Sequence, residues 1–120
     1  MADLKEKGIA LLASLSSVDM KTAASTTLLN VPADKVARIT HVVIRDASAS
    51  LAGGTDYDFT NWKQTVDLSS LTTAGTDYIV LDGNNVKYAE LGNSATFQIT
   101  VNTGSTATCT ATIDVFGYLV

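Results

Sequence analysis

A strict alternation of apolar and polar side chains near the end of the chain most constrains its fold. Every second residue is apolar from Phe97 to Val101, and the same period returns from Ala107 to Val115. A period of two matches a strand, whose successive side chains point to opposite faces, and does not match a helix. The residues between them, Asn102-Thr103-Gly104-Ser105, are typical of a turn. We therefore expect an antiparallel hairpin with one buried face and one threonine-rich face.

A second strand pair is expected around Pro32, the only proline in the chain. Proline holds φ at about −65° and suits the second position of a tight turn, so Val31-Pro32-Ala33-Asp34 is predicted to reverse the chain. The run before it, Thr26 to Val31, is predicted to be a strand. The run after it, Lys35 to Asp46, is the richest in β-branched residues, which is typical of a central strand.

The alternation inside this central strand is broken. Val42 and Ile44 share one face, whereas Ala37 and Ile39 have the opposite parity. A bulge near Thr40 would bring Ile39 back to the core face. Alternatively, both faces of the strand are covered, as happens when a second subunit packs against a sheet.

Length and composition indicate one β-rich domain. A chain of 120 residues with 46% hydrophobic residues can fill a single core. Short runs bounded by turn residues supply the remaining predicted strands, at Asp56–Asn61, Thr65–Leu68, Tyr78–Leu81 and Val86–Ala89. This pattern predicts an all-β fold, a single antiparallel β-sandwich of jelly-roll type with an N-terminal arm.

The arm is expected to span residues 1–17 and the sandwich domain residues 18–120. The arm could be a helix capped by Asp3, although Gly8 would cost such a helix about 1 kcal/mol. The alternative is an extended arm or edge strand from Gly8 to Ser14, which is favoured because strong helix-terminus signals are missing. Its apolar side chains have no obvious partner inside a small sandwich, so we expect them to contact a lattice or a neighbouring subunit. These residues are Leu4, Ile9, Leu11, Leu12 and Leu15.

Charge and hydropathy exclude several kinds of partner. The net charge of −4 and the pI of about 4.6 give no electrostatic footprint for a phosphate backbone, so no nucleic acid is expected. The apolar run from Ile9 to Leu15 is too short to span a bilayer, so no membrane partner is expected. Acidic residues before that run argue against a signal peptide and predict a protein used without a secretion step.

No set of residues with catalytic or metal-binding spacing accompanies these strands. His41 is the only histidine, and the chain has neither a G-x-S-x-G nor an H-x-x-H pattern, so we expect no enzyme. Asp56 and Asp58 could act as acid and base or hold calcium, but the sequence favours two solvated aspartates that flank Tyr57 and keep an edge soluble. Cys109 cannot form an internal disulfide and is expected to be a small buried residue. No metal and no cofactor are predicted.

Two aromatic residues could form a ligand platform. Tyr57 and Trp62 lie close together in the sequence, after the flexible loop at Gly53-Gly54, and could stack on a sugar. Aromatic residues in a core or at a subunit interface have the same composition, which leaves this alternative open. The loop is not a phosphate loop, because no Gly-Lys-Ser/Thr follows it.

One stretch of the chain resembles small virion proteins of tailed bacteriophages. The run Val18–Ala24 is followed by Thr27-Leu28-Leu29-Asn30-Val31-Pro32-Ala33-Asp34-Lys35 and then by Ile39–Arg45. It is similar to the T-L-x-x-V-P-A-G-K opening of those proteins and to the long strand after it. Asp34 stands where a glycine is usual. The resemblance covers roughly residues 18–60, including the loop Ser48–Gly54, and extends more weakly to Ile113–Tyr118.

This resemblance implies a structural protein of the virion, either a capsid decoration protein or a head-fibre β-sandwich. It implies a homotrimer, located in the virion, with the major capsid protein or another virion protein as its partner. An alternative is a carbohydrate- or receptor-binding module of a head or tail fibre, which would use the platform of Tyr57 and Trp62.

Overall fold

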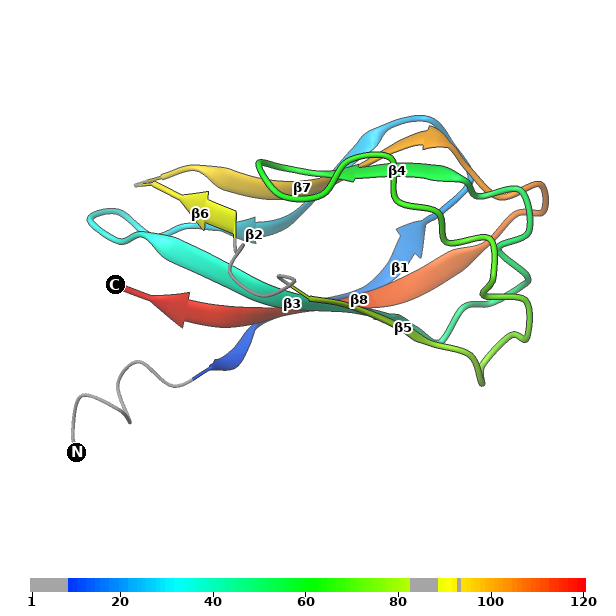
Figure 1. Cartoon of the computed structure of the whole chain (residues 1–120), viewed down its shortest axis with the longest axis horizontal. Helices are drawn as coiled ribbons and strands as arrows, with labels where there is room; N and C mark the ends of the chain where they lie inside the picture. Colours follow the sequence, from blue (N-terminus) through cyan, green and yellow to red (C-terminus); the bar gives the residue numbers. More distant parts are fainter. Residues whose placement is uncertain (1–8, 83–88, 93) are drawn as a thin grey trace.

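A computed structural model describes residues 9–82, 89–92 and 94–120, and these residues form two facing antiparallel sheets (Figure 1). The predicted all-β sandwich is therefore confirmed. Its strands are β1 (Ala10–Asp19), β2 (Ser25–Asn30), β3 (Ala37–Arg45), β4 (Asp56–Phe59), β5 (Ile79–Asp82), β6 (Ala89–Leu91), β7 (Thr96–Thr103) and β8 (Thr110–Leu119). No helix among the described residues is long and apolar enough to cross a membrane.

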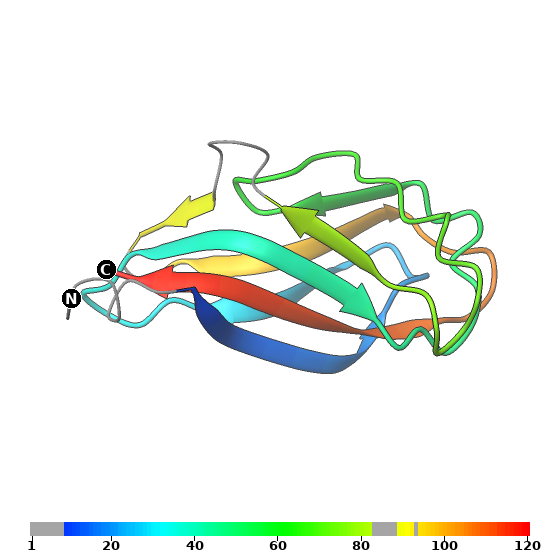
Figure 2. The same cartoon turned by 60° about the horizontal axis from the view of Figure 1, so that its bottom comes forward.

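The larger sheet has the order β1-β8-β3, and two short strands follow one another along the far side of β3 (Figure 2). Strand β5 pairs with His41–Ile44, and β6 pairs with Ala37–Ile39. The smaller sheet has the order β2-β7-β4. An isolated bridge between Tyr57 and Val66 lays the chain after β4 alongside it. Strand β1 is thus one edge of the larger sheet, and β5 and β6 form the other.

The two strands expected to form a C-terminal hairpin lie in different sheets. Strand β7 pairs with β2 and β4, whereas β8 pairs with β1 and β3, so the prediction of a hairpin was wrong. The connection between them crosses from one sheet to the other and is bound by the β1–β2 connection. The backbone N–H of Ser105 donates to the carbonyl of Met20 at 3.0 Å, and Met20 N–H donates to the carbonyl of Cys109 at 2.9 Å.

The chain reversal at the proline also connects the two sheets, because β2 and β3 belong to different sheets. Its turn is shifted by one residue from the predicted position. Lys35 N–H donates to the carbonyl of Pro32 at 3.3 Å, so Ala33 and Asp34 are the central residues. Asp34 has a φ of 64°, in the left-handed region that favours glycine. A glycine would adopt this conformation without the steric cost that a side chain carries.

The break in alternation within β3 is a bulge, as predicted. The pairing with β8 shifts between Ile39 and His41, which leaves Thr40 as the additional residue. Residues on both sides of the bulge therefore face the core, and Ala37, Ile39, Val42 and Ile44 are all fully buried. Gly117 lies opposite Ile39, where a Cβ atom would run into the carbonyl oxygen of Arg38. The absence of a side chain at Gly117 thus permits the close approach of β8 to the bulged strand.

Aromatic side chains from the smaller sheet and from the loop after β4 fill part of the space between the sheets. Phe59 of β4 and Phe97 of β7 are fully buried and stack with ring centroids 6.1 Å apart. Trp62, in the loop after β4, meets Phe59 edge-on at 6.1 Å. The opposite wall of the core is aliphatic and comes from β3 and β8, with Ile39, Val42, Ile44, Ile113 and Val115.

We expect Gly117→Ala to lower the free energy of unfolding by about 1–3 kcal/mol, because the added methyl group must displace the backbone at the bulge. Chemical denaturation of the purified protein measures this change. Gly92→Ala is the matched control, since a Cβ at Gly92 meets no atom within 4 Å, and its effect should stay below about 0.5 kcal/mol. Equal stability of the two variants would contradict the role given to Gly117.

Candidate interaction surface

The predicted N-terminal arm is, from Ala10 onward, an edge strand of the larger sheet. Residues 10–19 are extended and pair with β8, which decides between the helical and extended alternatives for these residues. The expected boundary between residues 17 and 18 falls inside β1. Residues 10–17 are therefore paired within the sandwich. Leu4 lies outside the described residues.

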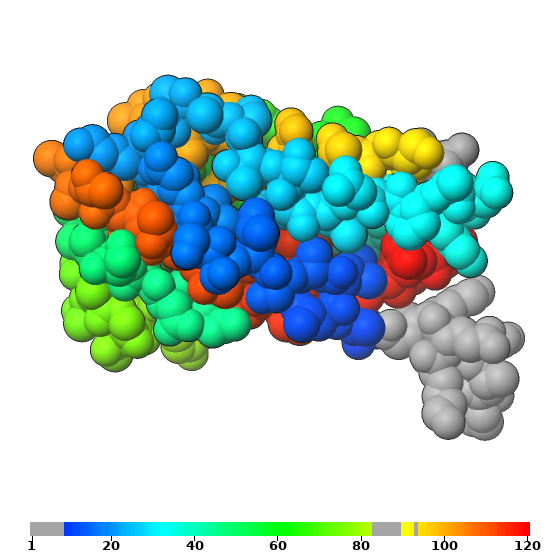
Figure 3. All heavy atoms as spheres, turned by 180° about the vertical axis from the view of Figure 1, so that it is seen from behind, coloured from blue at the N-terminus to red at the C-terminus, as the bar shows by residue number. Residues whose placement is uncertain are grey.

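The apolar residues of this segment divide into exposed and partly buried ones. Ile9, Leu11 and Leu15 are 56%, 55% and 36% exposed, respectively. Leu12 packs instead against the core of its own subunit. Figure 3 shows that β1, in dark blue, forms part of the surface on the side facing away from the viewer in Figure 1. Three of the five residues predicted to make contacts are therefore accessible to a partner.

The outer face of the smaller sheet is polar, and its side chains hydrogen-bond to one another. Gln98 Nε2 donates to Thr27 Oγ1 at 3.0 Å, and the hydroxyls of Ser25 and Thr100 lie 2.8 Å apart. Asn102 Nδ2 donates to Asp56 Oδ1 at 3.2 Å. These bonds link β2 and β4 to the central strand β7. Asp56 and Asp58 belong to this polar face, and no group of three or more potential ligands that could hold a metal occurs among the described residues.

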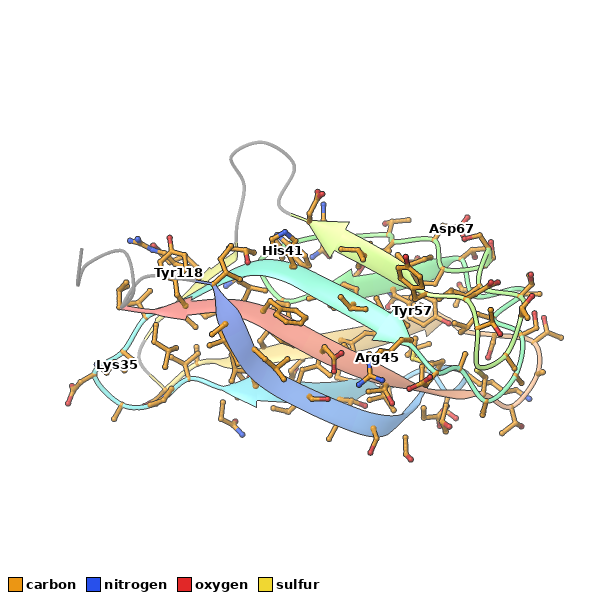
Figure 4. All side chains as sticks on the ribbon, turned by 90° about the horizontal axis from the view of Figure 1, so that it is seen from below. Lys35, His41, Arg45, Tyr57, Asp67 and Tyr118 are labelled. Carbon is orange, nitrogen blue, oxygen red and sulfur yellow. The ribbon has the colours of Figure 1, made fainter. Side chains whose placement is uncertain are left out.

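The outer face of the larger sheet is different, because apolar side chains cross it. The sheet pairing places Leu11 of β1 opposite Phe116 of β8, and Val43 of β3 opposite Val80 of β5. Phe116 and Val43 lie on neighbouring strands two residues apart in register, so they are diagonal neighbours. We name these residues, together with Tyr78 just before β5, the diagonal stripe: Leu11, Phe116, Val43, Val80 and Tyr78. Figure 4 looks onto this face.

A charged network on the same face ties three strands together. Asp114 of β8 accepts a hydrogen bond from Ser14 Oγ of β1 at 2.6 Å and another from Arg45 Nε of β3 at 2.8 Å. Arg45 also donates through Nη1 to Asp46 at 2.7 Å. Asp114 is 8% exposed although it points away from the core. The network therefore fixes the edge strand β1 to the centre of the sheet.

The protonation of Asp114 depends on this network. Burial alone would raise the pKa of Asp114, but the hydrogen bonds from Arg45 and Ser14 and the charge of Arg45 outweigh it, so the pKa lies below its ordinary value of 3.8. The same ion pair raises the pKa of the Arg45 guanidinium. Both groups are therefore charged at neutral pH.

The predicted ligand platform does not form. Tyr57 is fully buried, its hydroxyl donates to the carbonyl of Met20 at 2.8 Å, and burial raises its pKa to about 12. It therefore cannot present its ring to a ligand. Trp62 is partly exposed, but its ring packs on Phe59 and Phe97, and the ammonium of Lys63 lies 5.1 Å from its centroid. The burial of Tyr57 could have been predicted from the sequence, because Tyr57 and Phe59 are two residues apart and therefore lie on the same face of the strand.

His41 and Cys109 do not form a catalytic pair. His41 lies on the outer face of the larger sheet, where its Nδ1 is 2.9 Å from Thr40 Oγ1. Cys109 is a buried free cysteine, as predicted, and its Sγ contacts the carbonyl of Ala49 at 3.3 Å. The two side chains therefore point to opposite faces of the sheet, and His41 cannot serve as a base for the thiol.

Comparison with known proteins gives one informative likeness. No family model and no curated protein matches the chain. Among solved structures, a chain of the cyanophage Pam1 capsid asymmetric unit has a similar fold, with a TM-score of 0.55 and 13% sequence identity. The likeness covers 94% of this chain and 86% of that chain, so it extends over nearly the whole chain.

We expect Asp114→Asn to lower the free energy of unfolding at pH 7 by about 1 kcal/mol, because the charge-assisted bonds to Arg45 and Ser14 are weakened. The pKa of Asp114 is lowered in the folded state, so its contribution to stability is present above the ordinary value of 3.8 and disappears as the pH falls through the folded pKa. The difference between wild type and variant should therefore shrink below pH 3.8.

Chemical denaturation at several pH values measures this difference. Asp46→Asn is the control, because Asp46 pairs with the same arginine but its side chain is 56% exposed, and its effect should stay within about 0.5 kcal/mol. A gap between wild type and Asp114→Asn that does not change with pH would contradict the assignment.

Proposed function

We propose that this protein is a structural protein of a tailed-phage virion, which binds the head lattice as a homo-oligomer in the manner of a capsid decoration protein. The observation that carries the proposal is the likeness of nearly the whole chain to a chain of a phage capsid asymmetric unit. The resemblance of residues 18–60 to tailed-phage virion proteins supports it independently, because it rests on sequence rather than on the fold. In this proposal the protein acts through its surfaces and performs no catalysis.

The strand pairing supports a jelly-roll topology as part of this proposal. Strands β1 and β8, β2 and β7, and β3 and β6 are paired. A long hairpin wrapped onto two sheets produces such pairs, and this is how a jelly roll is built. The fourth pair of such a hairpin consists of β4 and the strand that follows it. Here the bridge from Tyr57 to Val66 places the chain after β4 alongside β4 in that position. Jelly rolls are common in viral capsid domains.

The edge strand β1 is the surface that we assign to the lattice contact. It ends one sheet, and it carries no charged side chain from Ile9 to Val18. Uncharged edge strands with exposed apolar residues are suited to pairing or packing with another chain. Ile9, Leu11 and Leu15 are its accessible apolar residues, and Leu4 remains a predicted contact in the preceding segment. Leu12 supports the contact from within, by anchoring β1 to the core.

The alternative function, a carbohydrate- or receptor-binding module, has less support. It relied on a platform of two aromatic residues, and Tyr57 is buried while Trp62 packs against the core. The homotrimer implied by the sequence resemblance stays a prediction about the number of copies. Native mass in solution tests it directly.

Binding to phage heads tests the proposed function. Heads of the parent phage assembled without this protein should co-sediment with the added wild-type protein. The double variant Ile9→Lys, Leu15→Lys should bind at least about 10-fold more weakly, because it places two charges in an apolar contact. Point substitutions are preferable to a deletion of residues 1–17, which would remove most of β1.

The double variant Thr96→Lys, Asn102→Lys is the matched control, since it adds the same charge to β7 in the smaller sheet, to which β1 does not belong. Thermal unfolding confirms that each variant is folded. The proposal fails if the wild-type protein does not bind heads, or if the substitutions in β1 weaken binding no more than the control does.

A further inference from the structure

The contact that we assign to β1 continues onto the outer face of the larger sheet. Leu11 of β1 lies opposite Phe116 of β8, so the two side chains are cross-strand neighbours. Phe116 is the diagonal neighbour of Val43 of β3, and Val80 of β5 lies opposite Val43. A protein surface that covers the side chain of Leu11 therefore meets Phe116 next, and the diagonal stripe continues that contact to the far edge of the sheet.

The stripe is accessible in the single chain. Leu11, Val80 and Tyr78 are 55%, 50% and 66% exposed. Phe116 and Val43 lie between them and are partly buried. Single exposed apolar residues are ordinary, but a contiguous apolar group crossing four strands is typical of an interaction site.

The outer face of the smaller sheet has the opposite character. Buried and outward residues alternate along its central strand β7, and every outward residue there is polar: Thr96, Gln98, Thr100 and Asn102. Three of these four hydrogen-bond to side chains of β2 or β4. A partner on this face would displace water from hydroxyl and amide groups without gaining apolar burial in return.

The charged groups beside the stripe indicate the chemistry of the partner. Arg38 Nε donates to Glu90 at 2.9 Å, and Arg45 Nε donates to Asp114 at 2.8 Å. Both arginines thus already have a carboxylate partner within the chain, so the face does not require opposite charge from another molecule. It suits an apolar, weakly charged surface.

We infer that the protein sits on the head with the outer face of the larger sheet against an apolar surface of the lattice, and with the polar outer face of the smaller sheet toward solvent. The two sheets face one another across the core (Figure 1), so covering one outer face leaves the other free. This inference rests on the proposed function, because it states which face of the protein that function uses. It holds for a homotrimer as well, provided that the copies contact one another elsewhere than at the stripe.

Cysteine labelling of head-bound protein tests this orientation. The only native cysteine, Cys109, is buried, so a thiol introduced at the surface is the reactive one. Val80→Cys places a thiol in the stripe, and Thr96→Cys places one at an exposed outward position of β7. Each full-length variant is reacted with biotin maleimide, once free in solution and once bound to heads of the parent phage that were assembled without this protein.

Both thiols should react at comparable rates in the free protein. On heads the labelling rate of Val80→Cys should fall at least about 10-fold, whereas that of Thr96→Cys should stay within about two-fold of its value in solution, because a thiol reacts only where it is accessible. Co-sedimentation with heads confirms that each variant is bound.

A binding measurement complements the labelling. The double variant Tyr78→Arg, Val80→Arg should bind heads at least about 10-fold more weakly than the wild type, because it places two charges in the apolar contact. Thr96→Arg, Asn102→Arg is the matched control and should bind like the wild type. Thermal unfolding confirms that both variants are folded.

Equal labelling of the two thiols on heads would overturn the inference and leave the proposed function standing. Slow labelling of Val80→Cys in the free protein would also overturn it, because other copies of the chain, and not the head, would then cover the stripe. Heads that bind neither the wild type nor the variants would refute the proposed function and this inference with it.

Discussion

The bulge at Thr40 is the constraint on which both surfaces of the larger sheet depend. Side chains alternate along a strand, so a register that is offset by one residue exchanges the buried and exposed sets. The additional residue lets Ile39 and Val42 both face the core and leaves Arg38, His41 and Val43 outside. Gly117 permits this geometry, because a side chain there would meet the carbonyl of Arg38. The buried face of β3 and the outward positions of Val43 and Arg45 follow from this one local irregularity.

The sequence predicts the bulge but not the sheet to which each strand belongs. Parity alone separates Ile39 from Val42, so the irregularity can be read directly from the order of the residues. The alternation of β7 and β8 is the same whether the strands pair or face one another across the core. Their separation depends on contacts of the β7–β8 connection with residues far away in sequence, such as the bonds of Ser105 and Cys109 to Met20. No local pattern contains that information.

The interaction surface shows the same division between local and distant information. Exposed apolar residues near the N-terminus are visible in the sequence, and Ile9, Leu11 and Leu15 are indeed accessible. The bulge in β1 between Leu11 and Ala13, which places Ala13 opposite the buried Val115 on the core face, is not visible there. The role of Asp114 also cannot be predicted from the sequence, because it depends on hydrogen bonds from Ser14 and Arg45, on two strands that are distant in the chain.

The charged network affects how costly it is to cover the outer face. Burying an unpaired charge is expensive, whereas an ion pair with its hydrogen bonds made has already lost part of its hydration. Asp114 is 8% exposed in the single chain, so much of its desolvation cost is met within the subunit. A partner that covers the stripe therefore gains apolar burial while adding little desolvation at Asp114.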